Sequence, residues 1–160
     1  MDITLVQVAI PDGSNIILGQ THFIKTAEDL YEIVAGTVPG ARFGIAFSEA
    51  SGPCLIRTEG NDDGLIAACV GTLKDIGAGH LFCIYLRNVF PVNILNQIKS
   101  CPEVCRVFCA TANPLQVIVA SSSQGRGVLG VIDGFSPKGV ETPADRKERK
   151  EFLRKIGYKL

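Results

Sequence analysis

The chain has 160 residues, of which 46% are hydrophobic and 20% charged, and its 16 Lys and Arg balance its 16 Asp and Glu. One hydrophobic core of ordinary size is expected, because this length is too short for two comfortable domains. The longest apolar stretches are of strand length, far below the ~20 residues of a membrane helix, and the first residues lack the pattern of a secretory signal. The composition therefore predicts a globular cytoplasmic protein with no membrane partner.

The first half of the chain predicts strands interleaved with two helices. Thr26 is the expected N-cap of a helix over residues 27–37. Asn61 or Asp62 is the expected N-cap of a second helix, whose apolar stripe continues to Ile76. The segments with strand character, of which the first two are expected to pair as a hairpin, are residues 3–10, 16–24, 42–48 and 54–58.

The second half opens with a central strand over residues 80–87, which is almost continuously apolar, as expected of a buried strand. A short helix follows from Pro91 to about Lys99. Further strands are expected at residues 104–110, 115–121 and 127–133. This order predicts a single compact α/β or α+β domain, with a mixed sheet of about seven strands and three or four helices.

The C-terminal segment differs in composition from the rest of the chain. Residues 135–160 are expected to form a connector and a basic helical tail, attached to a domain of residues 1–134. Residues 145–160 hold seven Lys or Arg against three Asp or Glu, and the interleaving of both signs favours a solvated helix face over a nucleic-acid-binding surface. The tail helix is expected to start at Pro143 and to dock through three apolar side chains, Phe152, Leu153 and Ile156.

Uncommon polar residues gather in short Gly-, Ala- or Pro-rich turns at the ends of the apolar runs. Small residues let a ligand approach the backbone, and rigid strands hold polar side chains in place. This pattern is typical of a small-molecule site. The residues in these turns are Glu49, Ser51, Asn61, Asp62, His80, Asn113 and Arg126.

Phosphate-binding motifs are absent or out of context. The segment Gly125–Gly130 matches GxGxxG, but the following residues continue as a strand, so a hairpin or bulge that exposes Arg126 is expected instead. No GxxxxGK[ST] motif occurs, so phosphate chemistry would need other residues than those of a P-loop. His22 and His80 are the candidates, because each lies between a turn and an apolar run and an imidazole held by a carboxylate is a competent nucleophile or proton carrier.

The six cysteines are expected to be free thiols, since five of them lie in or beside apolar patterns. Cys105 and Cys109 fall on one strand face about 13 Å apart, which is too far for both to bind one zinc ion. A magnesium or zinc site built from His, Glu and Asp stays open as an alternative, with no metal ligand assigned.

Seven longer segments carry a family resemblance. They are GQTHFIKTAEDLYE, FGIAFSEASG, LIRTEGNDD, GAGHLF, FPVNILNQIK, PEVCRVFCATANP and QGRGVLGVIDG. Together they cover nearly residues 1–134 and resemble the adenosine-specific kinase family of small prokaryotic proteins. The resemblance implies adenosine as ligand and a phosphorylated histidine, either His22 or His80. Ser48 stands where Cys is common in the family, which argues against an essential thiol there, and the tail past Gly134 is longer than the family pattern requires.

The leading hypothesis is an adenosine- or AMP-binding phosphotransferase that acts through a phosphohistidine. Mg²⁺ is the expected cofactor if the protein transfers a phosphoryl group. Two alternatives stay open: a non-catalytic adenosine or AMP sensor, and a metal-dependent nucleoside hydrolase. The Gly-rich and weakly charged composition also predicts a homo-oligomer, a dimer or a trimer. Ribose is usually held by a carboxylate, and adenine by an apolar slot with Asn or backbone contacts; the residues that supply such polar groups are Glu49, Asn61, Asp62, Asn93 and Asn113.

Overall fold

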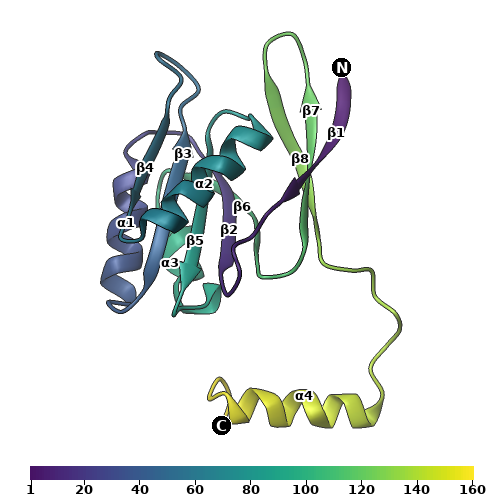
Figure 1. Cartoon of the computed structure of the whole chain (residues 1–160). Coiled ribbons are helices and arrows are strands. Elements are labelled where there is room, and N and C mark those ends of the chain that lie inside the picture. Colours follow the sequence, from purple (N-terminus) through teal and green to yellow (C-terminus); the bar gives the residue numbers. More distant parts are fainter.

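Eight strands and four helices make up the computed structural model, which describes residues 1–160 (Figure 1). The strands form two antiparallel sheets, one of five strands and one of three. The elements in chain order are β1 (Asp2–Val8), β2 (Asn15–Thr21), α1 (Thr26–Thr37), β3 (Arg42–Ser48), β4 (Ile56–Gly60), α2 (Asp63–Ile76), β5 (Leu81–Arg87), α3 (Pro91–Ser100), β6 (Val104–Thr111), β7 (Leu115–Ser121), β8 (Arg126–Asp133) and α4 (Pro143–Lys155).

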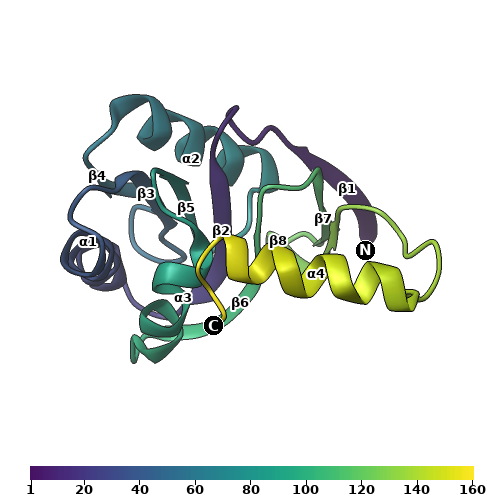
Figure 2. The same cartoon turned by 90° about the horizontal axis from the view of Figure 1, so that it is seen from below.

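The five-stranded sheet has the order β4-β3-β5-β2-β6, so β5 lies at its centre. Residues 81–86 of β5 are all buried, as expected of a strand that is apolar on both faces. Ile84 faces α1 and α3 in one apolar cluster, and Cys83 faces α2 and the three-stranded sheet in another. Figure 2 shows α2 on one side of the sheet and α1 and α3 on the other.

The three-stranded sheet has the order β1-β7-β8, with Asp2 opposite Ser121 and Val8 opposite Leu115. The expected hairpin between residues 3–10 and 16–24 is therefore wrong. The turn after Pro11 carries the chain from one sheet to the other, and β2 pairs with β5 and β6 instead. Because β2 is buried over most of its length, its place is inside the larger sheet, whereas β1 is largely exposed.

The fold class expected from the sequence is confirmed as a single α+β domain. The strands number eight, and they lie in two antiparallel sheets rather than in one mixed sheet of about seven. Asp62 is the N-cap of α2, where its carboxylate accepts from Leu65 N at 3.0 Å. Thr26, in contrast, is the first residue of α1 and not its cap; its hydroxyl donates to Phe23 O at 2.6 Å.

The C-terminal helix α4 does not dock on the body of its own chain, contrary to expectation. It begins at Pro143, as expected, and its N-cap Thr142 forms a capping box with Asp145. None of its residues is buried, and Phe152 and Ile156 are 58% and 43% exposed. In Figure 1 the helix stands away from both sheets on an extended connector. Neither this helix nor any other in the fold combines the length and the apolar character needed to span a membrane.

We predict that Gly44→Ala destabilises the protein. A Cβ built on Gly44 of β3 would lie 2.3 Å from Ile66 N, because the first turn of α2 rests directly on the strand. We expect a loss of about 1–3 kcal/mol in the free energy of unfolding, as for other overpacked sites. Gly71→Ala is the control, since Gly71 in α2 has open space around it and Ala should raise helix stability by about 0.5–1 kcal/mol. Urea unfolding measures both; equal effects would contradict the close approach.

Candidate functional site

The five-stranded sheet separates the predicted site residues into two groups. Antiparallel pairing brings the end of β3 and the start of β5 to one edge, together with the end of β2. At this edge, or next to it in the second sheet, lie His22, Glu49, Ser51, His80 and Arg126. The opposite edge, about 20 Å away along the strands, holds Asn61, Asp62, Asn93 and Asn113.

Asn61 and Asp62 at the far edge are occupied by local structure. The Asn61 side chain accepts from Phe43 N at 2.9 Å and donates to Ala41 O at 2.8 Å, so it joins the end of β4 to the start of β3. The hydrogen bond from Leu65 N lowers the pKa of Asp62. These partners give both residues a structural role in capping and turn formation.

The other two residues at the far edge are likewise engaged in turns. Asn93 accepts from Phe90 N at 2.9 Å at the start of α3. Asn113 donates to the carboxylate of Asp133 at 3.1 Å, which ties the β6–β7 turn to the end of β8. The structure therefore does not bring the nine predicted residues into one cleft.

The near edge contains a hollow of about 600 Å³ between the ends of the two sheets. One wall comes from the ends of β2, β3, α2 and β5, and the other from the start of β1 and the β7–β8 hairpin. This volume lies within the 300–1,000 Å³ that small-molecule sites usually enclose. Its lining residues are Met1, Gln20, Glu49, Ala50, Cys54, Gly77, Gly79, His80, Ala120, Ser121, Ser122, Gln124, Gly125, Arg126 and Gly127.

Glu49 is the acidic side chain of this hollow, and it is held in place by two donors. Leu55 N donates to one carboxylate oxygen at 2.9 Å and Arg57 donates to the other at 2.9 Å. These two hydrogen bonds lower the pKa of Glu49, the one from Leu55 most. A carboxylate has about four acceptor positions, so the fixed and ionised Glu49 can still accept from ligand hydroxyls.

His80 sits in a strained backbone conformation at the mouth of β5. Its φ of 57° lies in the left-handed region that favours glycine. The conformation is fixed by two backbone hydrogen bonds, from His80 N to Ser48 O at 2.7 Å and from Thr21 N to His80 O at 2.9 Å. The imidazole stacks on Phe47, with ring centroids 5.9 Å apart. Cys54, which also lines the hollow, has a φ of 52°, and such strain gathers at functional sites.

His22 lies at the same edge but does not line the hollow. It follows Thr21, which pairs with His80, so the two histidines come from adjacent strands. His22 is exposed, its ring stacks on Phe23 with centroids 6.3 Å apart, and its backbone N donates to Glu103 O. Of the two histidines, His80 is the one placed on the hollow.

Arg126 joins the two walls. Its guanidinium donates to Asp75 O at 3.2 Å and to Ile76 O at 3.4 Å, at the C-terminus of α2. A cation at this end of a helix is favoured by the helix dipole. The expected hairpin around Arg126 is present as the β7–β8 turn, and this contact fixes the hairpin against α2 while other donors of the side chain stay available.

Several residues of the hollow were not singled out from the sequence. Gln20 lies two positions before His22, within the first of the family segments, and Ser122 and Gln124 lie in the β7–β8 turn before Gly125. A polar run beside a Gly-Arg-Gly turn is a local signal for them. Met1 gave no such signal, because its place depends on the pairing of β1 with β7.

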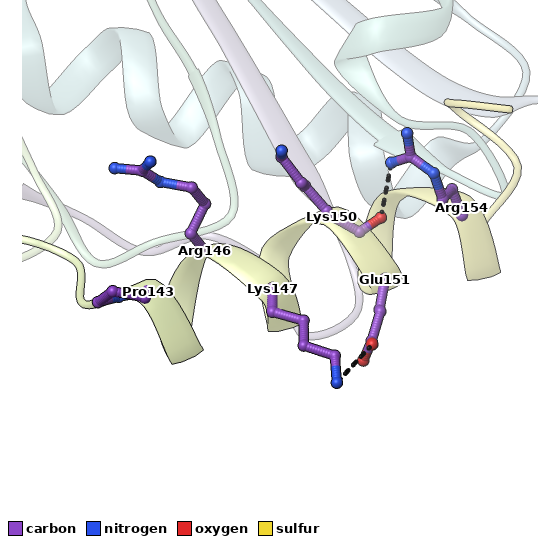
Figure 3. Close-up of a pocket in the computed structure, with 6 residues that line it drawn as sticks. All are labelled: Pro143, Arg146, Lys147, Lys150, Glu151 and Arg154. Atoms are coloured by element: carbon purple, nitrogen blue, oxygen red, sulfur yellow. Dashed lines mark hydrogen bonds and ion pairs between the residues drawn. The ribbon is translucent and has the colours of Figure 1, made fainter.

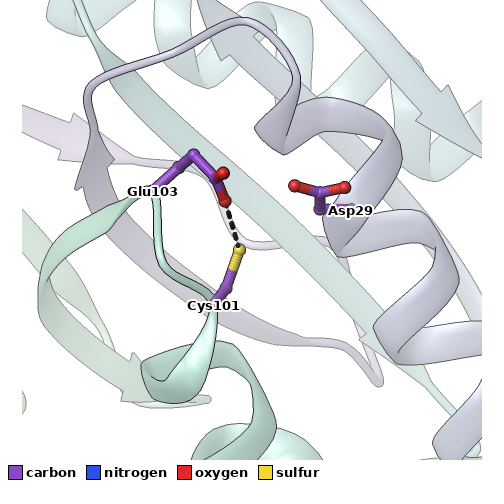
Figure 4. A group of neighbouring side chains, drawn as sticks. All are labelled: Asp29, Cys101 and Glu103. Carbon is purple, nitrogen blue, oxygen red and sulfur yellow. Dashed lines mark hydrogen bonds between the residues drawn. The ribbon is translucent and has the colours of Figure 1, made fainter.

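A second polar cluster surrounds Lys25 at the start of α1. Figure 4 shows Asp29, Cys101 and Glu103 facing one another, with the thiol donating to Glu103 at 3.3 Å. Although these three groups are close enough to share a metal ion, the Lys25 ammonium forms ion pairs with both carboxylates, at 3.0 Å to Glu103. The lysine thus provides the positive charge that a metal would supply.

A further hollow lies along α4 alone (Figure 3). All of its lining residues belong to this one helix, so it has no second wall, and we assign no site to it. Its residues are Pro143, Arg146, Lys147, Lys150, Glu151 and Arg154.

One family model matches nearly the whole chain, and one solved structure is similar to it over its full length. A family model described as adenosine specific kinase matches residues 6–159. The match includes α4, so the C-terminal helix belongs to the family pattern and does not extend beyond it. The crystal structure of the PH1918 protein from Pyrococcus horikoshii OT3 is similar to this chain, with 44% sequence identity and a TM-score of 0.95 over 99% of this chain and 98% of that one. No curated protein matches the sequence.

We predict that Glu103→Gln lowers the melting temperature at neutral pH and that the difference fades in acid. The hydrogen bond from Lys25, followed by that from Cys101, lowers the pKa of Glu103 from its ordinary 4.5 to about 2. A carboxyl group whose pKa is lower in the folded protein than in the unfolded chain stabilises the folded protein. This contribution is complete above the pKa of the unfolded chain and is lost as the pH falls to the pKa of the folded protein. Thermal unfolding between pH 7 and pH 2 should therefore show wild type and variant converging over the interval from 4.5 to about 2. Glu32→Gln, at an exposed position of α1, is the control. A difference in melting temperature between wild type and Glu103→Gln that does not change with pH would contradict the assignment.

Proposed function

Because the chain belongs to the adenosine specific kinase family, we propose that it binds adenosine or AMP in the hollow between the two sheets and transfers a phosphoryl group through His80. The observation that carries the proposal is the meeting of His80, Glu49 and Arg126 around one hollow of about 600 Å³. Two lining residues with strained backbones support it. His22, on the adjacent strand, is the second candidate for the phosphoryl carrier.

The polar groups of the hollow suit a nucleoside. Glu49 is ionised, fixed by Leu55 and Arg57, and able to accept from the two ribose hydroxyls. Arg126 supplies positive charge for a phosphate, and the glycines on both sides of it let a ligand approach the hairpin backbone. Gln20 and Gln124 are side-chain amides that can pair with the edge of adenine.

The proposed transfer has two displacement steps at phosphorus. In the first, an imidazole nitrogen of His80 attacks the terminal phosphorus of a phosphate donor, a nitrogen–phosphorus bond forms, and the bond to the donor oxygen breaks. In the second, the adenosine 5′-hydroxyl attacks the same phosphorus, the nitrogen–phosphorus bond breaks, and the hydroxyl proton passes to solvent. The phosphate oxygens of the donor would hold Mg²⁺, which would offset their negative charge, because the two free acceptor positions of Glu49 are assigned to the ribose hydroxyls.

A non-catalytic adenosine or AMP sensor is the second candidate. It is favoured by the existing partners of Glu49 and Arg126, since groups already fixed by the protein can recognise a ligand without taking part in chemistry. The metal-dependent hydrolase has less support, because the cluster that could bind a metal contains Lys25.

We also propose that the protein is a homo-oligomer. Large apolar side chains are exposed on several elements, among them Ile3, Leu5, Leu129 and Phe152, each at least 57% accessible. Exposed apolar surface of this extent is typical of a protein that associates.

We predict that Glu49→Gln weakens adenosine binding by about 2 kcal/mol, or roughly 30-fold in Kd, because the ribose would lose charge-assisted hydrogen bonds. Wild type should discriminate against deoxyadenosine, and Glu49→Gln should do so less. The matched control is Asp62→Asn, which makes the same carboxylate-to-amide change at the far edge of the sheet and should leave the Kd unchanged. Isothermal calorimetry with adenosine, AMP and guanosine measures these values. Loss of binding in Asp62→Asn with none in Glu49→Gln would move the ligand to the other edge.

We predict that incubation with a phosphate donor adds one acid-labile phosphoryl group to the intact protein. His80→Asn should abolish the gain and His22→Asn should retain it, because His80 lines the hollow and His22 does not. Intact-mass spectrometry before and after acid treatment is the measurement. The reverse pattern would make His22 the carrier, and no gain with any donor, beside normal adenosine binding, would favour the sensor.

A further inference from the structure

The three-stranded sheet is apolar on the side that faces away from the rest of the molecule. Val6 and Val8 of β1 point into the core, so the alternating residues Ile3 and Leu5 point outward. Leu5 lies opposite Ile118 of β7. We use the term outer face for the surface formed by Ile3, Leu5, Ile118, Leu129 and Ile132.

This outer face has less polar cover than an exposed sheet normally has, because its polar side chains are Gln7 and Gln116, which lie opposite each other on β1 and β7. Ile3, Leu5, Leu129 and Ile132 are between 43% and 61% exposed, and none of the residues that alternate outward on the three strands is charged. An antiparallel sheet with one face in solvent usually carries polar residues there. No helix of the chain lies on this side of the sheet in Figure 1.

Helix α4 has the complementary property, an apolar face without a partner. Phe152 and Ile156 lie one turn apart on one side of the helix, and both are exposed. The hydrogen bonds and ion pairs of the helix are formed within residues 141–159, and none reaches the body. A connector of residues 134–142 carries the helix away from its own sheets.

The charges of the helix and the body are opposite. Residues 145–160 hold seven Lys or Arg and three Asp or Glu, a net charge of +4, whereas residues 1–144 hold nine and thirteen, a net charge of −4. A second copy of the chain offers both the acidic body and the outer face. Each copy has one outer face and one helix α4, so every helix in an assembly can have a partner. Such reciprocal exchange between copies closes into a symmetric assembly.

We propose that α4 of one copy packs through Phe152 and Ile156 on the outer face of a second copy. The inference rests on the proposed homo-oligomer and names the surfaces that build it. Ala120, an outward residue of β7, also lines the hollow, so the exchanged helix lies beside the candidate site of the copy that receives it. The basic residues of α4 would then contribute positive charge close to that site.

The test uses full-length variants at micromolar concentration, with light scattering to measure native mass. Phe152→Gln on α4 and Leu5→Thr on the outer face should each reduce the assembly to the single-chain mass of 17.1 kDa. Lys147→Gln on the charged side of α4 and Val92→Thr, an exposed apolar residue on α3, are matched controls that should keep the wild-type mass. A mixture of the two variants should regain assembly in part, because the intact helix of Leu5→Thr can bind the intact outer face of Phe152→Gln while the reverse contact stays impaired.

Cross-linking of wild type keeps the proposal testable should a variant fail to fold. In a mixture of isotopically labelled and unlabelled chains, an amine-reactive reagent should join the Met1 amine to a lysine of α4. Some of these links should join a labelled peptide to an unlabelled one, which is possible only between two copies of the chain. Links within one isotope alone, or an assembly unchanged by Phe152→Gln and Leu5→Thr, would overturn the helix exchange and leave the homo-oligomer standing. A monomeric wild type would overturn both, while calorimetry with adenosine would still report separately on the proposed ligand.

Discussion

Six consecutive residues of β5, from Leu81 to Leu86, are buried on both faces of the larger sheet, and the other elements are arranged to cover them. Helices α1 and α3 close one face, and α2 with the three-stranded sheet closes the other. Polar side chains cannot be buried in such a strand without partners, so they gather at the two edges where strands end. The candidate site and the capped turns are both consequences of this single constraint.

The two edges of the five-stranded sheet differ in what their polar side chains contact. At the far edge, the side chains of Asn61, Asp62 and Asn93 satisfy backbone groups that would otherwise lack partners. At the near edge, the end of the second sheet stands opposite, and a hollow remains between them. Turns of similar composition thus cap backbone groups at one edge and line a hollow at the other, and only the pairing of the strands distinguishes the two.

This difference explains what the sequence could predict. Local patterns were sufficient for the strands, for a helix cap at Asn61 or Asp62 and for the hairpin at Arg126, because each depends on neighbouring residues. The pairing of β1 with β7 and the ion pairs of Lys25 with Glu103 join residues far apart in the chain, and no local signal specifies them. The same holds for the grouping of His80 with Arg126, which requires both sheets to be in place.

The pairing of Asp2 with Ser121 also has a consequence for the order in which the protein is made. During synthesis, β1 has no partner until β7 has left the ribosome, and the second wall of the hollow is missing for the same interval. Contacts at such sequence separation form late, because closing a long loop costs entropy before the contact stabilises it. The hollow that we propose as the nucleoside site is therefore complete only when synthesis of the chain is almost finished, so a protein with a defective fold would lack it.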